Sequence, residues 1–259
     1  MKSIRELDQA ACSQLKFILC DIDDTITTGG KLTRASYNAL WDLAQKGYGI
    51  IPVTGRPAGW CDMIIRQWPV KAVVGENGAF VYYTEGSHIK TFTHPSVAKA
   101  NVIQKLELVK GACLKGVPGC RVARDQFARI YDLAIDFHED PPYLGLEAAE
   151  KIRDICVSMG AEAKISSIHV NAWFGDYNKL SMTERFMKEI LKEENIKEKI
   201  IFVGDSPNDE PMFGYFPLSC AVANILPFEK MLHQLPSYVT LRKGGEGFAE
   251  LAEHILALC

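Results

Sequence analysis

The 259-residue sequence lacks long hydrophobic runs, and its apolar runs, such as 79–83 and 255–259, are short. A helix that crosses a bilayer needs roughly 20 apolar residues, so we expect no membrane partner. The opening MKSIRELDQAACSQLKF carries charges throughout and lacks an apolar segment, which indicates no secretory signal.

The sequence also lacks an excess of either charge, with 29 Lys and Arg against 32 Asp and Glu and a formal net charge of −3. Without a basic surplus there is no general means of neutralising many phosphates, so we expect no nucleic-acid partner. The eight cysteines are scattered and form no C-x-x-C pair, which favours reduced thiols in a cytoplasmic protein over a disulfide framework. We expect a monomer or a homodimer with a small-molecule partner.

Four short apolar runs each end in a polar cluster. They are residues 16–20, 49–53, 72–74 and 200–203. Continuous apolar runs are typical of parallel strands that are buried on both faces. Apolar residues at helical spacing separate them, with stripes in 37–44 and 182–191. This alternation predicts an α/β fold with a doubly wound parallel sheet.

The middle of the chain has a different pattern. Residues 131–138 and 168–174 alternate apolar and polar side chains, which predicts strands with one apolar and one polar face. Helical patterns accompany them at about 96–110 and 145–159. We therefore expect an inserted α+β domain at 85–175 within a core formed by 1–84 and 176–259. Residues 1–15 are predicted to form an extra helix.

The polar clusters should meet, because ligands bind beyond the carboxyl ends of parallel strands. Asp21, Asp23 and Asp24 follow the first strand, and Asp205 and Asp209 follow the fourth. Several carboxylates this close are costly unless a cation relieves them, and such hard oxygen ligands suit Mg²⁺. The histidines show no spacing that would indicate Zn²⁺.

A carboxylate at such a site can also act as a nucleophile and form an aspartyl-phosphate. Phosphoryl transfer then depends on neutralising charge. Mg²⁺, the hydroxyl of Thr54 and the ammonium of Lys179 could share this role. Lys188 and Lys192 stay open as alternatives for the lysine.

At these residues the sequence resembles the haloacid dehalogenase-like phosphatase superfamily. Its four motifs match, in order, Asp21-Ile-Asp23-Asp24-Thr25, Val53-Thr54-Gly55-Arg56, Lys179 and Gly204-Asp-Ser-Pro-Asn-Asp209. Leu180 stands where the family often has Gly after the lysine. The inserted domain resembles the type IIB cap, which implies a Rossmannoid core and a substrate class of sugar phosphates. The same resemblance covers phosphomannomutases.

The resemblance implies a role for each matching residue. Asp21 would be the nucleophile, and Asp23 would protonate the leaving alcohol and later activate water. Asp21, the backbone carbonyl of Asp23 and Asp205 would hold Mg²⁺, while Thr54 and Lys179 would bind the phosphoryl group. Supporting roles fall to Gly55, Arg56, Asn208 and Asp209.

The sequence gives weaker signals for substrate contacts in the inserted domain than for the motif residues of the core. Arg124 and Arg129 could clamp a second anionic group, or could be surface charges. The polar strand face offers Asp132, Asp136, His138, His169 and Asn171, which could read the leaving group if this face covers the site. Otherwise it is an ordinary solvated sheet face, the interpretation that we prefer for most of these residues.

These observations favour a Mg²⁺-dependent phosphomonoesterase that acts on a small, sugar-like phosphate ester. A phosphomutase with the same chemistry is the first alternative. A non-enzymatic phosphoacceptor or sugar-phosphate-binding regulator is the second. Asp23 weighs against the regulator, because a stable phospho-signal gains nothing from an acid–base group beside the nucleophile.

Overall fold

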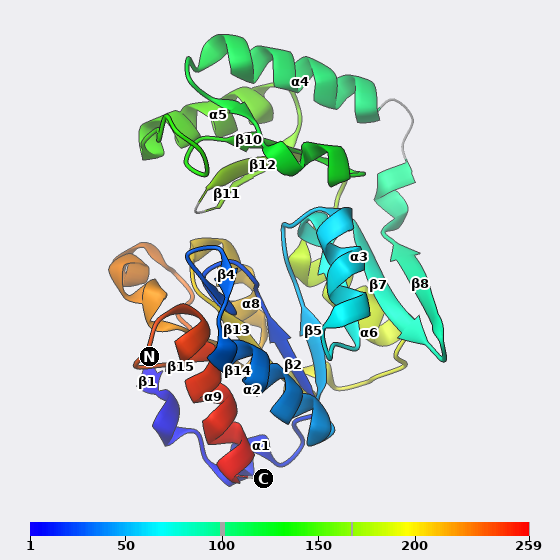
Figure 1. Ribbon diagram of the computed structural model, residues 1–259, viewed down its shortest axis with the longest axis vertical. Coiled ribbons are helices and arrows are strands. Elements are labelled where there is room, and N and C mark those ends of the chain that lie inside the picture. The colour runs from blue at the N-terminus through cyan, green and yellow to red at the C-terminus, as the bar shows by residue number, and fades with distance from the viewer. Residues whose placement is uncertain (99–101, 167, 259) are drawn as a thin grey trace.

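The computed structural model describes residues 1–98, 102–166 and 168–258, which form a lower α/β layer and an upper α+β layer (Figure 1). A six-stranded parallel sheet forms the centre of the lower layer, in the order β1-β15-β14-β13-β2-β5. Its strands are β1 (Lys2–Ser3), β2 (Phe17–Cys20), β5 (Gly49–Pro52), β13 (Ile200–Gly204), β14 (Leu218–Ala221) and β15 (Tyr238–Val239).

Helices cover both faces of this sheet, which explains the continuous apolar runs. In β2, Ile18 and Cys20 pack toward α2 (Arg34–Gln45) and α9 (Gly244–Leu258). The alternate residues Phe17 and Leu19 pack on the opposite side, in the cluster with residues of α6 (Lys179–Glu189) and α8 (Glu210–Tyr215). The predicted doubly wound fold is confirmed.

A second sheet extends the core beyond β5. A parallel bridge between Val53 and Val74 joins β6 (Ala72–Gly75) to that edge, and β6 pairs antiparallel with β7 (Phe80–Glu85) and then β8 (His88–Thr93). The predicted domain boundary at residue 85 falls inside this hairpin. Tyr83 and Phe92, on either side of it, both contact Phe186 of α6. The division at 85 and 175 stays a prediction.

The upper layer lies in the inserted segment and contains the elements within residues 102–173; we call it the cap. Its sheet has the antiparallel order β11-β12-β10-β9, formed by β9 (Arg121–Val122), β10 (Asp132–Asp136), β11 (Glu162–Ile165) and β12 (His169–Trp173). The helices α4 (Val102–Gly116) and α5 (Leu146–Ser158) pack on one face. The other face lies over the carboxyl ends of the core strands (Figure 1).

Our interpretation of the polar strand face as solvated is wrong. Every residue of β10 and β12 is buried. The alternation correctly predicts that the two faces of the sheet differ. However, the polar face is covered by the core instead of by water. Its polar side chains therefore need partners within the protein.

The predicted helix at 1–15 is also wrong in its extent. The segment begins with the edge strand β1, followed by the short turns η1 (Ile4–Glu6) and α1 (Gln9–Cys12). Ile4, Leu7 and Cys12 are buried against the α9 side of the sheet. The imidazole of His254 on α9 lies 2.8 Å from the carbonyl oxygen of Leu7 and holds the segment there.

The remaining elements are short connections around these layers. They are β3 (Thr27–Thr28), β4 (Lys31–Leu32), α3 (Ala58–Gln67), η2 (Glu76–Gly78), η3 (Pro95–Ala98), η4 (Arg124–Ala128), α7 (Ile196–Lys199), η5 (Pro207–Asp209) and η6 (Ala223–Met231). Among the described helices, none combines the length and the hydrophobicity that crossing a membrane requires.

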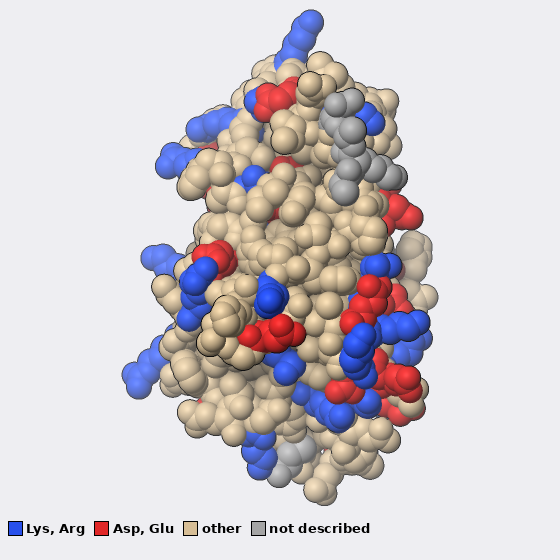
Figure 2. Space-filling model, turned by 90° about the vertical axis from the view of Figure 1, so that its right-hand side faces the viewer, with Lys and Arg blue, Asp and Glu red and all other residues tan. Residues whose placement is uncertain are grey.

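Charged residues and cysteines are distributed as the composition suggests. On the face shown in Figure 2, basic and acidic side chains are interspersed, consistent with the net charge of −3. Seven cysteines lie among the described residues, and all seven are buried. Cys259 lies outside the described residues.

Candidate active site

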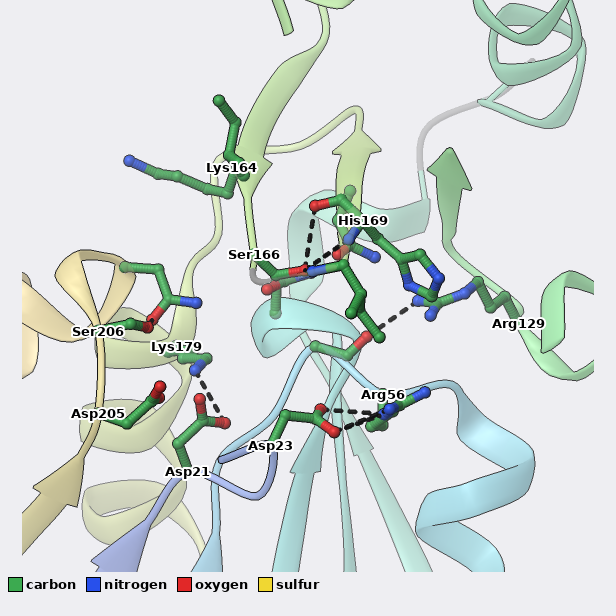
Figure 3. Close-up of a pocket in the computed structure, with 16 residues that line it drawn as sticks. Asp21, Asp23, Arg56, Arg129, Lys164, Ser166, His169, Lys179, Asp205 and Ser206 are labelled. Atoms are coloured by element: carbon green, nitrogen blue, oxygen red, sulfur yellow. Dashed lines mark hydrogen bonds and ion pairs between the residues drawn. The ribbon is translucent and has the colours of Figure 1, made fainter. Parts of the chain in front are cut away.

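Two neighbouring parallel strands bring the predicted carboxylates together. β2 pairs with β13, and the backbone N–H of Asp21 extends this pairing by donating to the carbonyl of Val203 at 2.9 Å. Asp21 and Asp205 therefore leave the sheet side by side, and both line one pocket (Figure 3). The side chains are almost fully buried, with 5% of Asp21 and 7% of Asp205 exposed.

Lys179 connects these two strand ends from the first turn of α6. Its Nζ lies 3.1 Å from Oδ1 of Asp21 and 3.1 Å from Oδ1 of Asp209. The second oxygen of Asp209 accepts the backbone N–H of Asp205 at 3.1 Å. Asp209 is thus fully occupied in holding the lysine and the loop after β13. Lys188 and Lys192 are exposed and do not line the pocket, which favours Lys179 among the three lysines.

Gly204 leaves room for this arrangement. A Cβ atom at that position would lie 2.7 Å from Cγ of Asp209, well inside van der Waals contact. The glycine therefore lets the carboxylate of Asp209 approach the backbone and reach Lys179.

Three carboxylates cluster at this point, and Lys179 contacts two of them, Asp21 and Asp209. Oxygens of Asp21, Asp205 and Asp209 lie within 4.8 Å of one another. Burial raises the pKa of Asp21 to about 7, which Lys179 opposes and Asp209 reinforces. Burial, followed by Asp209 and Asp21, raises the pKa of Asp205 well above its ordinary value. A hard divalent cation would relieve both, because it interacts with the ionised form of these carboxylates.

Asp23 is held by an arginine from the neighbouring strand end. Arg56 donates from Nε to both carboxylate oxygens at 3.1 and 2.9 Å, and from Nη2 to Oδ1 at 2.8 Å. Its Nη1 also lies 3.5 Å from Asp125 and 3.6 Å from Glu139, which both belong to the cap. Arg56 therefore joins Asp23 to the cap; Figure 3 shows its contact with Asp23.

Two neighbours of these residues have structural contacts. Asp24 has a positive φ of 54° and its side chain accepts the N–H of Gly29 at 3.2 Å. Thr54 is fully buried, its Oγ1 accepts the N–H of Arg56 at 3.1 Å, and it does not line the pocket. Gly55 and Asn208 do line it.

The structure divides the candidate cap residues into two groups. Arg129, His169 and Asn171 line the pocket. Arg129 is already committed, because its side chain is 1% exposed and it donates to Asp132 and to the carbonyl of Gly55. Its guanidinium N–H groups hold the cap on the core, so it cannot also bind a second anion with a bidentate contact.

The other candidates lie outside this pocket. Arg124 has a side chain that is 82% exposed and pairs with Asp140. Asp136 is buried and accepts the N–H groups of the loop 138–140. His138 lines a neighbouring groove instead.

Sequence reasoning missed several residues of the pocket wall. The lining residues that it missed are Asn77, Lys164, Ile165, Ser166, Ile168 and Ser206. It also missed Glu139, which does not line the pocket but joins Arg56 to His169, whose Nε2 lies 2.9 Å from Oε2 of Glu139. Asn77 belongs to the polar cluster after the third strand, which was the one available signal for it.

The pocket is closed by the cap. Its free volume is about 40 Å³, whereas small-molecule sites have about 300–1,000 Å³. A substrate larger than a phosphoryl group therefore requires either movement of the cap or space next to the pocket.

Comparisons with known proteins agree with this geometry. A family model described as haloacid dehalogenase-like hydrolase matches residues 18–114, which include Asp21, Asp23 and the loop Thr54–Arg56. No curated protein sequence gives a significant match.

Solved structures match over nearly the whole chain. A protein of Thermoplasma acidophilum has a TM-score of 0.73 at 18% identity, covering 95% of this chain and 100% of that one. The trehalose-6-phosphate phosphatase C-terminal domain of C. albicans has a TM-score of 0.73 at 17% identity, covering 98% of this chain and 97% of that one. The sucrose-phosphatase of Synechocystis has a TM-score of 0.62 at 15% identity, covering 93% and 98%. The predicted fold and the resemblance to haloacid dehalogenase-like hydrolases are both confirmed.

Proposed function

We propose that this chain, a structural relative of haloacid dehalogenase-like hydrolases, is a Mg²⁺-dependent phosphomonoester hydrolase. Its substrate would be a small, sugar-like phosphate, and an aspartyl-phosphate would form on Asp21. The observation that carries this proposal is the contact of Lys179 with Asp21 on the floor of a pocket that Asp23 and Asp205 also line.

The donor set fits Mg²⁺. Asp21 and Asp205 present buried carboxylate oxygens, and the one positive charge of Lys179 offsets only part of the negative charge of the three carboxylates. We propose that Asp21, Asp205 and the backbone carbonyl of Asp23 hold the ion, with Asp209 as a supporting residue. Bound there, Mg²⁺ supplies charge neutralisation for the transferring phosphoryl group.

In the first step, a carboxylate oxygen of Asp21 attacks phosphorus and the bond from phosphorus to the ester oxygen breaks. Asp23, as the carboxylic acid, gives its proton to the departing alcohol oxygen. Lys179 orients Asp21 and neutralises charge on the phosphoryl oxygens. We propose a phosphoryl-binding role for Thr54 as well, through its hydroxyl hydrogen. This role requires the pocket to extend to Thr54 when substrate enters, because Thr54 does not line the closed pocket.

In the second step, Asp23 is ionised and takes a proton from water as the water oxygen attacks phosphorus. The bond from phosphorus to Asp21 breaks, which releases phosphate and restores both carboxyl groups. The bidentate contact with Arg56 holds the carboxylate of Asp23 in one orientation for both proton transfers.

Movement of the cap fits the closed pocket. We propose that the cap, the part of the predicted insert 85–175 that follows the β7–β8 hairpin, opens from the core to admit the ester and closes to exclude water. The polar cap residues His169, Asn171 and Ser166 would then face the leaving group. A sugar-like substrate accords with these polar groups and with the sugar phosphatases among the structural neighbours.

The test must also distinguish the hydrolase from two alternative functions. A phosphomutase would return the phosphoryl group to a second sugar, and the same residues would serve it. A phosphoacceptor regulator would keep the phosphoryl group on Asp21, which the adjacent Asp23 disfavours. We further propose a cytoplasmic monomer or homodimer.

The test measures phosphate release from a panel of sugar phosphates and phosphoglycerates, with Mg²⁺ or with EDTA. We expect release only with Mg²⁺ and none by Asp21→Asn, whose circular dichroism spectrum should match that of the parent. Full turnover by Asp21→Asn would contradict the mechanism. A sugar bisphosphate product without phosphate release would favour the mutase, and a long-lived phosphoprotein without turnover would favour the regulator.

A further inference from the structure

A second, larger cavity adjoins the reaction pocket. It has a volume of about 740 Å³ and lies between the cap and the core, whereas the reaction pocket has about 40 Å³. The two spaces are adjacent, because five residues line both of them: Ile165, Ser166, Asp205, Ser206 and Asn208. Three of these residues are labelled in Figure 3 (Ser166, Asp205 and Ser206). We call the larger space the side groove.

Both walls of the side groove carry apolar side chains. Phe137, Leu144 and Leu146 line it from the cap. Phe228 and Met231 of η6 line it from the core. Several of these side chains are open to solvent, with exposed fractions of 58% for Leu146, 37% for Phe228 and 61% for Met231.

This lining is poorly suited to a bare sugar. Each hydroxyl of a hexose needs a hydrogen-bond partner when it leaves water. Polar side chains such as His138 and Asn224 also line the groove, but the apolar side chains that form much of both walls offer no such partner. An alkyl chain or an apolar ring, in contrast, is favoured when it leaves water for such walls. The charged groups of the groove are Glu150, Arg153 and Lys243 from its two sides, together with Asp24 and Asp205.

We propose that the side groove holds the far part of the substrate's leaving group, and that this part is an apolar chain or ring. The polar part of the alcohol would stay beside Ser166 and Asn208, where the groove meets the reaction pocket. This inference rests on the proposed phosphatase function and narrows its substrate class to phosphate esters of amphipathic alcohols.

The test uses n-alkyl phosphates from ethyl to octyl, with glucose 6-phosphate for comparison. In the wild type, kcat/KM should rise about three- to fourfold for each CH₂ that enters the groove. Leu146→Ser on the cap wall and Met231→Ser on the core wall should flatten this rise, so that each variant loses a larger factor in kcat/KM on octyl phosphate than on ethyl phosphate. Both side chains are largely exposed, so folding should be preserved. Leu108→Ser and Leu241→Ser, which are exposed outside the groove, are the controls.

Each other outcome overturns the inference in a recognisable way. If the wild type hydrolyses all esters with kcat/KM independent of chain length, the phosphatase stands and the groove assignment fails. If the two groove variants lose the same factor on ethyl and octyl phosphate, the walls meet each other during cap closure and do not hold the substrate.

A complete absence of hydrolysis would contradict the proposed function but still leave the groove testable. Calorimetry with n-alkylphosphonates then decides. A dissociation constant that falls with chain length in the wild type and not in Met231→Ser supports the groove, and one independent of chain length overturns it.

Discussion

The Oε2 atom of Glu76 accepts the backbone N–H of Tyr131 at 2.6 Å, which joins the turn after β6 to the start of the cap strand β10. The same carboxylate accepts the N–H groups of Ile130, Asp132 and Ala58 at 2.9, 3.2 and 3.0 Å. Glu76 has no exposed surface and a positive φ of 43°. One buried carboxylate therefore satisfies four backbone donors from both layers.

This contact predicts a pH-dependent stability. Burial, reinforced by Asp132, raises the pKa of Glu76 from 4.5 to about 7. The folded state thus binds this proton more tightly than the unfolded state, so the stabilisation is complete below about pH 4.5 and is lost as the pH rises through about 7. We expect Glu76→Gln to remove roughly 3 kcal/mol of pH dependence across this window.

Urea unfolding from pH 4.5 to 8 measures this effect as the difference between the variant and the wild type. Glu85→Gln, at an exposed carboxylate of β7, is the matched control. Its free energy of unfolding should depend on pH as that of the wild type does. If the unfolding free energy of Glu76→Gln depends on pH as in the wild type, Glu76 is not the source of the pH dependence.

Lys179→Met should lose both activity and stability. The variant leaves Asp21 and Asp209 buried without their cation, and breaking a buried pair in this way typically costs about 3–5 kcal/mol. Thermal unfolding and phosphate release are the two measurements. Lys188→Met, at an exposed lysine of the same helix, should change neither.

Mg²⁺ should stabilise the protein through Asp205. A ligand that binds only the folded state adds about 2.7 kcal/mol at a concentration of 100 times its Kd. We expect Mg²⁺ to raise the melting temperature of the wild type and not that of Asp205→Asn. Asp62→Asn, at a helix surface, should keep the full response. A shift of equal size in Asp205→Asn would exclude Asp205 as a ligand.

Arg56→Lys should lower kcat by about 10- to 100-fold and change KM less. A lysine ammonium cannot hold both oxygens of Asp23 and still reach Asp125 and Glu139 as the planar guanidinium does. Steady-state kinetics check this prediction. Arg66→Lys breaks a similar bidentate contact with Asp62 on the exposed surface and should leave kcat unaltered. Equal losses in both variants would point to a general effect of the substitution.

The core could be predicted from local patterns because each of its signals is contained in a few consecutive residues. The residues Phe17–Cys20 are all apolar, so both faces of this strand need to be covered. Asp21 and Asp205 then follow strands that end at the same edge of the sheet. The proximity of Lys179 to Asp21 was predicted from the resemblance and is present in the structure.

The cap required tertiary structure. The alternation in Asp132–Asp136 and His169–Trp173 determines that the two faces differ, but it does not say what covers the polar face. That depends on how the cap packs on the core, through contacts such as Glu76 with Ile130 that join residues 54 positions apart. Arg124 and Arg129 illustrate the consequence, since one is exposed and the other is buried five residues later.

The amino-acid sequence by itself thus determined three features. They are the doubly wound core, the polar clusters that follow its strands, and the group of carboxylates near Lys179. The tertiary structure alone decided which cap residues reach the pocket, that Arg56 joins Asp23 to Glu139, and that an apolar groove lies beside the site. The physical reason is the range of the forces involved. Hydrophobic periodicity acts between near neighbours, whereas the pairing of buried charges depends on which distant segments exclude water from one another.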